Sequence, residues 1–231
     1  MTAPEAHAPH PFRTSSHLPF ASRLDGLSVP YTGQARMRLT VASGLADALV
    51  RVDPDAVDLI AIDCGDAPPP RLRVWASELR VSWPLTFGEW LRAVLAGDSR
   101  DVEIVLHPAV EWTLAVRGGL SRFEADLAAG KLARLEISGG ISQASLDLPA
   151  AGGVVPILIS GGVSDLGLRR PAATGVDLAV SGGISDLCLD DQSFRAIGGA
   201  ARLTTDAGRA ASSRYAVEIS GGASDLEIVA H

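Results

Sequence analysis

A short phrase recurs in the second half of the chain, and its regular spacing constrains the fold more than any other feature of the sequence. The phrase is Ser-Gly-Gly, an apolar residue and a serine, followed in most copies by Asp-Leu. The copies are SGGISQASL at 138–146, SGGVSDLGL at 160–168, SGGISDLCL at 181–189 and SGGASDLEI at 220–228, with a weaker copy, RGGLSRFEA, at 117–125. The first glycines of successive copies are 21, 22, 21 and 39 residues apart. Such a period is typical of repeat proteins, whose units stack and share a core.

The residues around each glycine pair alternate between apolar and polar, which is the period of a half-buried strand. Two short strands joined by Gly-Gly in about 21 residues fit one rung of a β-solenoid, whereas a unit of an α-solenoid needs about 33–47 residues. Glycine provides the positive φ or the close backbone approach that a tight corner requires. We therefore predict an all-β fold, a single-stranded, β-helix-like β-solenoid with rungs of about 21 residues.

The alternation also predicts which side chains face the core. Ser164 is two residues before Leu166, so we expect the two to share the inner face. The equivalent serines would line an inner corner; they are Ser121, Ser142, Ser164, Ser185 and Ser224. A structural role is favoured for them over a catalytic one, because no copy of the phrase carries a neighbouring histidine.

The aspartates of the phrase are then expected to point outward. Asp165 and Asp186 would lie in adjacent rungs, about 4.8 Å apart by strand spacing, and stacked like charges require a partner. A solvated face neutralised by arginine is one interpretation, and a ligand or cation site is the other. The candidate ligand-binding residues are Asp165, Asp186, Asp225 and Arg169, and no metal ligands or cofactor are assigned.

The repeats place most of the chain in one domain. We expect a disordered or extended tail at 1–24 and a single β-solenoid domain at 25–231, with a less regular half at 25–110 and regular repeats at 111–231. Thr86-Phe-Gly-Glu89 has the form of a helix capping box and is followed by apolar residues at helical spacing. This pattern predicts a short capping α-helix near 87–96.

Two further segments depart from the regular repeat. Residues 36–52 can be aligned with the phrase as a degenerate copy. Between 190 and 214 a Gly-Gly pair lacks the following Ser-Asp-Leu, which predicts an irregular rung or an inserted loop. Insertions in solenoids often carry binding sites, so this stretch is either functional or a decayed rung.

Composition excludes several classes of partner. The formal net charge is −7 and the positive charge is spread thinly without a basic cluster, which disfavours nucleic acid and anionic membranes. No apolar run is long enough to span a membrane, and no secretion signal is evident, so a cytoplasmic location is expected. Cys64 and Cys188 lack metal-binding spacing and are expected to be buried thiols.

The sequence contains no phosphate-binding loop, dinucleotide-binding fingerprint, zinc-protease motif or hydrolase elbow. His107 is expected to be structural. The favoured function is a non-catalytic cytoplasmic scaffold or binding module, with a protein partner or self-association through the ends or faces of the solenoid. The alternative is an enzyme that acts on a carbohydrate or small metabolite in a groove along the solenoid.

The recurring Ser-Gly-Gly corners and the apolar strand that closes each rung resemble the putative-adhesin, or toast-rack, β-solenoid domains of bacteria. The resemblance covers roughly residues 36–231 and depends on the copies at 138–146, 160–168, 181–189 and 220–228. It implies an interaction or sensory module of a kind often found beside envelope-stress membrane proteins. It implies no catalytic residues.

Overall fold

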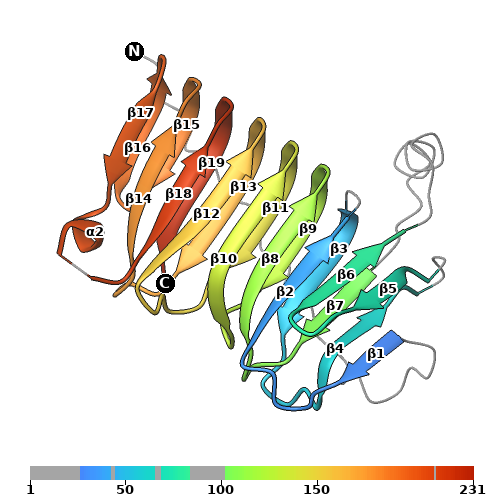
Figure 1. Ribbon diagram of the computed structural model, residues 1–231. Helices are drawn as coiled ribbons and strands as arrows, with labels where there is room; N and C mark the ends of the chain where they lie inside the picture. Colours follow the sequence, from blue (N-terminus) through green and yellow to red (C-terminus); the bar gives the residue numbers. More distant parts are fainter. Residues whose placement is uncertain (1–26, 43–44, 66–68, 84–101, 211) are drawn as a thin grey trace.

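The computed structural model describes residues 27–42, 45–65, 69–83, 102–210 and 212–231, and every structural statement below concerns these residues. They form two large sheets that face each other (Figure 1). The prediction of an all-β fold is confirmed. The expected tail at 1–24 and the expected helix near 87–96 lie outside the described residues.

The first sheet has ten strands. In spatial order these are β1 (Leu27–Pro30), β4 (Asp58–Asp63), β7 (Val102–Leu106), β3 (Leu45–Val52), β9 (Leu120–Asp126), β11 (Ile141–Asp147), β13 (Val163–Arg170), β19 (Ala223–Ala230), β15 (Ile184–Leu189) and β16 (Gln192–Ile197).

The second sheet has nine strands, and a short helix, α2 (Asp206–Ala210), follows one of them. In spatial order the strands are β17 (Ala201–Thr204), β14 (Gly175–Val180), β18 (Arg214–Ile219), β12 (Val154–Ser160), β10 (Lys131–Ser138), β8 (Glu111–Arg117), β2 (Arg36–Val41), β6 (Glu78–Ser82) and β5 (Arg71–Val74).

Each copy of the phrase forms one corner between the sheets. The strand before Gly-Gly lies in the nine-stranded sheet and the strand after it lies in the ten-stranded sheet, as in β10–β11 and β12–β13. Neighbouring rungs pair in parallel and in register, so that Ile141 is beside Val163 and Leu146 is beside Leu168. The strands of the degenerate copy follow the same rule, since β2 lies in the nine-stranded sheet beside β8 and β3 lies in the ten-stranded sheet beside β9.

The rungs are not stacked in the order of the sequence. The last rung, β18–β19, lies between β12–β13 and β14–β15 in both sheets (Figure 1). The expectation that Asp165 and Asp186 occupy adjacent rungs is therefore wrong, because β19 separates their strands. The step of 39 residues before the final copy contains the chain that passes around the outside of β14–β15.

Antiparallel strands cover both ends of the stack. At one end β16 pairs with β15 and β17 pairs with β14; at the other end β4 pairs with β7 and β5 pairs with β6. The sheets are thus mixed, and the chain is not a uniform stack of parallel rungs. Most of the stretch 190–214 forms β16, β17 and α2 at one end of the stack. Because β16 lies in the ten-stranded sheet and β17 in the nine-stranded sheet, and both pair antiparallel with the preceding rung, this stretch is an irregular rung, the first of the two predicted alternatives.

Alternating apolar side chains from both sheets form one continuous core. Two aromatic side chains in the core donate hydrogen bonds to backbone carbonyls: the Trp112 indole to His107 O at 3.0 Å, and the Tyr215 hydroxyl to Pro149 O at 2.6 Å. Burial raises the pKa of Tyr215 above its ordinary value, so this hydroxyl stays protonated. No helix in the described part of the chain is long and apolar enough to cross a membrane.

The first glycine of each corner is required by close stacking. A Cβ on Gly139 would lie 2.6 Å from the Gly118 carbonyl carbon, and one on Gly161 would lie 2.4 Å from Gly139 O. Both glycines also have positive φ, 138° and 151°. The second glycine is less constrained, since a Cβ on Gly140 would lie 3.6 Å from the nearest atom, Gly162 O.

Candidate functional site

The residue after each serine of the phrase has a left-handed backbone conformation. Its φ is 57° at Asp165, 53° at Asp186 and 51° at Asp225. Aspartate is one of the few non-glycine residues that adopt this conformation readily. The aspartates of the phrase therefore have a structural reason to be there, whatever else they do.

This conformation overturns the predicted facing of the serines. Val163 and Leu166 are both buried, while Ser164 and Asp165 between them lie at the surface. The left-handed residue adds one position to the strand alternation, as a β-bulge does. The next side chain to face the core after Val163 is therefore that of Leu166. The serines line an outer corner, and the prediction that they line an inner one is wrong.

The exposed corner of three adjacent strands carries the candidate residues. We use the name corner ridge for the Ser-Asp pairs of β13, β19 and β15; they are Ser164 with Asp165, Ser224 with Asp225, and Ser185 with Asp186. The serines pair in register from strand to strand, so successive aspartates follow one another at about 4.8 Å. Strand order brings the three aspartates together, with Asp225 in the middle.

The same column continues toward the other end of the sheet with a different charge pattern. Gln143 occupies the position on β11, and Arg122 and Asp47 occupy it on β9 and β3, all with positive φ. Arg122 donates two hydrogen bonds to the Asp47 carboxylate, which raises the pKa of the guanidinium. Among the described residues, by contrast, no basic side chain pairs with the three aspartates of the corner ridge.

Arg169, the remaining candidate, does not join them. It lies four residues beyond Asp165 on β13, and its guanidinium pairs with Asp147 on the neighbouring strand β11. Arg170 is buried and pairs with Asp190. No group of three or more His, Cys, Asp or Glu side chains within the described ranges is placed to hold a metal ion.

A shallow depression of about 530 Å³ runs beside the corner ridge and is open to solvent. It is lined by corner glycines such as Gly162, by aliphatic side chains such as Ile184, and by Ser164, Ser185 and Ser224. Its lining contains no ionisable side chain.

His107 lies elsewhere in the molecule. Its ring stacks on Tyr31 with 3.8 Å between ring centres, and its Nδ1 accepts a hydrogen bond from Ala109 N at 3.2 Å. It directly follows β7, which is four strands away from β13 in the sheet. The histidine therefore does not meet the aspartates.

The two cysteines also lie far apart. Cys64 follows β4 and Cys188 is on β15, near opposite ends of the ten-stranded sheet. Both are half-buried free thiols, and burial raises the pKa of each. These thiols are poor nucleophiles at neutral pH, because the reactive species is the thiolate.

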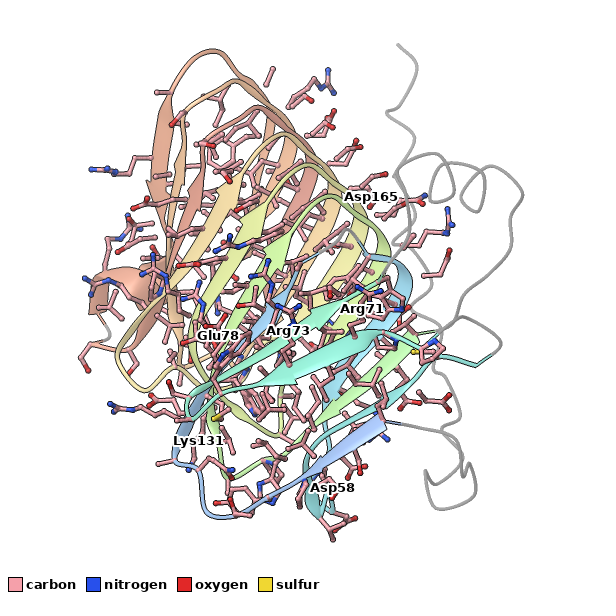
Figure 2. All side chains as sticks on the ribbon, turned by 45° about the vertical axis from the view of Figure 1, so that its right-hand side comes forward. Asp58, Arg71, Arg73, Glu78, Lys131 and Asp165 are labelled. Atoms are coloured by element: carbon pink, nitrogen blue, oxygen red, sulfur yellow. The ribbon has the colours of Figure 1, made fainter. Side chains whose placement is uncertain are left out.

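A basic cluster forms on the nine-stranded sheet although none is expected from the sequence. Arg71 and Arg73 project from β5 (Figure 2). Arg80 on β6 is the register partner of Arg73. All three are exposed and none has a described ion-pair partner. The alternation in Arg71-Leu-Arg73 was visible in the sequence, but the pairing register that adds Arg80 was not.

Comparison with known proteins identifies the fold. No protein-family model matches the chain, and no curated protein matches it in sequence. The chain is similar in structure to a crystal structure of a "putative cell adhesion protein" from Clostridium sporogenes, with a TM-score of 0.61. The two are 17% identical over 90% of this chain and 98% of that chain. The likeness between the two proteins is one of fold.

Proposed function

We propose that the chain is a non-catalytic binding module, built as a β-solenoid of the toast-rack type, which engages a protein partner through its outer surface. The observation that carries the proposal is the separation of its reactive groups. The aspartates lie on an open ridge, Arg169 pairs with Asp147, and His107 stacks on Tyr31. General acid–base catalysis requires such groups within hydrogen-bond reach of one bound substrate.

Two further observations support a binding role. The structural neighbour carries the name of a cell adhesion protein, and adhesion is binding at a surface. Stacked rungs also offer long, regular faces, which repeat proteins use to bind partners. The corner ridge and the basic cluster are two charged parts of this surface without an ion-pair partner among the described residues.

A protein partner is favoured over end-to-end stacking of copies. The four edge strands of the two sheets carry Pro30, Arg73, Arg195 and Arg202. Proline and charged side chains on an edge strand oppose pairing with another copy. Light scattering should accordingly give the monomer mass of 23.9 kDa; a defined oligomer would instead support self-association.

One observation favours the enzymatic alternative, a depression that has three serines in its lining and three aspartates beside it. If the protein hydrolyses carbohydrates there, it should release chromophore from a panel of nitrophenyl glycosides. The Asp165→Asn, Asp225→Asn, Asp186→Asn triple variant should then lose this activity. Because asparagine also tolerates the left-handed conformation, the variant tests charge without disturbing the backbone.

The experiment that tests the proposal combines capture and turnover. The full chain is immobilised, bound proteins are identified by mass spectrometry, and each is purified and titrated against the free chain by calorimetry. We expect at least one saturable complex, and no glycoside turnover above buffer. Turnover that the triple variant abolishes, together with no saturable protein complex, would overturn the proposal.

A further inference from the structure

Among the described residues, the edge strand β5 combines unpaired backbone groups, unpaired cationic side chains and exposed apolar side chains. We propose that β5 is a docking edge for an extended acidic segment of a partner protein, which would add to the nine-stranded sheet as one more strand. The proposal rests on the binding role above and names the surface and the chemistry of the partner.

Only alternate residues of β5 direct their backbone N–H and C=O groups toward β6. Trp75 N donates to Glu78 O at 2.8 Å, which fixes the phase of the antiparallel ladder between β5 and β6. Hydrogen-bonded and non-hydrogen-bonded pairs alternate along such a ladder. The N–H and C=O groups of Leu72 and Val74 therefore point away from β6, and β5 is the last strand of its sheet. These two residues can form up to four hydrogen bonds with an incoming strand.

The arginines determine the charge of the segment that can dock. Arg71 and Arg73 are two residues apart, so they share one face of β5 at about 7 Å spacing. Arg73 faces Arg80 directly across the ladder, and like charges in that position are unfavourable without an anion. The nearest carboxylate along β6, Glu78, already accepts a hydrogen bond from Thr40. Carboxylates on alternate residues of an added strand would lie beside this cluster.

Apolar exposure favours a peptide over a non-peptide polyanion. Val74 is 52% exposed and Trp75 is 48% exposed, which are large values for such side chains in this protein. Alternate residues of an added strand would place apolar side chains against Val74 on the face opposite the arginines. A polyanion such as polyphosphate offers neither these apolar groups nor a matching backbone.

The same arginines would disfavour the wrong partner. A second copy of β5 added at this edge would bring two basic strands together, and the repulsion would oppose the pair. A strand with carboxylates would meet no such penalty. The edge is therefore selective as well as available.

Calorimetry with a synthetic peptide tests the proposal. The probe is a blocked eight-residue peptide in which glutamate alternates with valine. The control peptide has four consecutive glutamates followed by four valines, so charge and composition are equal but the carboxylates do not share one strand face. We expect saturable binding of the alternating peptide and much weaker binding of the control peptide and of polyphosphate.

Protein variants then separate charge from backbone pairing. Arg71→Gln and Arg73→Gln should each weaken binding about 2- to 5-fold, the range for exposed ion pairs. The matched Arg195→Gln, Arg202→Gln variant, which changes exposed arginines at the opposite end of the molecule, should bind normally. Val74→Pro removes an edge N–H without removing a bond to β6, and should weaken binding about 10-fold or more, whereas Val74→Thr should not.

A peptide variant protects the test against misfolding of the proline variant. The alternating peptide carrying N-methyl groups on the edge that faces β5 should lose binding to the unchanged protein, because its donors are blocked. Equal binding of the methylated peptide, of the control peptide or of polyphosphate would show simple anion attraction and overturn the proposal. Absence of all peptide binding would also overturn it, while partner binding that is insensitive to Arg71 and Arg73 would leave the broader binding role intact.

Discussion

At the residue scale, the recurring aspartate is explained first by backbone geometry. Asp165 has a φ of 57°, a conformation that costs most L-residues about 1–2 kcal/mol. β-Branched residues are disfavoured there most strongly. The aspartates of the corner ridge thus serve the corner itself, and their negative charge is an additional property of the surface.

We therefore expect different outcomes from valine substitutions at two adjacent surface positions, Ser164 and Asp165. Asp165→Val should lower the free energy of unfolding by about 1–2 kcal/mol, because valine must adopt the left-handed conformation. Ser164→Val, at the exposed position one residue earlier, should change it by less than about 0.5 kcal/mol. Urea denaturation of the two variants measures the difference. Equal losses would show that φ is not the reason for aspartate.

The two glycines of a corner should also differ. Gly139→Ala must fit a Cβ 2.6 Å from the Gly118 backbone at a φ of 138°, so it should cost more than about 1 kcal/mol. Gly140→Ala brings its Cβ only to 3.6 Å from Gly162 O and should cost clearly less. Thermal unfolding of both variants distinguishes them, and a more severe loss in Gly140→Ala would contradict the stacking of the corners.

At the element scale, a buried ion pair links β13 and β15, the strands on either side of β19. The Arg170 side chain at the end of β13 is 1% exposed and bonds both carboxylate oxygens of Asp190, just after β15, at 2.6 and 2.7 Å. Strand β19 lies between these two strands, and His231 N donates to Arg170 O at 3.0 Å. The ion pair therefore connects the rungs that contain β13 and β15, on either side of the rung that contains β19.

Removing either partner of this pair should be costly. Asp190→Asn keeps a residue that tolerates the φ of 53° at this position but leaves the Arg170 charge buried, and should destabilise by about 3 kcal/mol. Arg209→Gln, which removes an exposed pair with Asp206, is the control and should have little effect. Chemical denaturation gives the free energy of unfolding of both variants. A loss below about 1 kcal/mol for Asp190→Asn would show that the Arg170–Asp190 ion pair does not stabilise the arrangement of these rungs.

The strands around each corner could be predicted from sequence because local signals define them. Alternation and Gly-Gly placed strands before and after residues such as Gly139 and Gly161. The facing of Ser164 could not be predicted, because a single left-handed residue shifts the alternation and no pattern of apolar residues records φ. The sequence does contain one signal of the shift: two polar residues, rather than one, stand between the apolar residues Val163 and Leu166.

At the scale of the whole molecule, the order in which the rungs stack could not be predicted from the sequence. β13, β15 and β19 carry nearly the same phrase, and the spacing of 39 residues does not indicate which of them is the neighbour of β19. The residues that meet in the corner ridge and in the basic cluster depend on which strands pair. Asp225 is placed between Asp165 and Asp186, and Arg80 opposite Arg73, only by pairing between strands.

The most direct test of this arrangement is a disulfide between strands. After Cys64 and Cys188 are replaced by serine, Ser164→Cys is combined either with Ser224→Cys or with Ser185→Cys, and the folded protein is mildly oxidised. Ser164 and Ser224 are register partners on neighbouring strands, at about 4.8 Å and within disulfide reach. Ser164 and Ser185 are two strands apart, at about 9.6 Å and beyond it. We expect a rapid intramolecular disulfide between positions 164 and 224 and none between positions 164 and 185; the reverse result would show that β15, not β19, is the neighbour of β13.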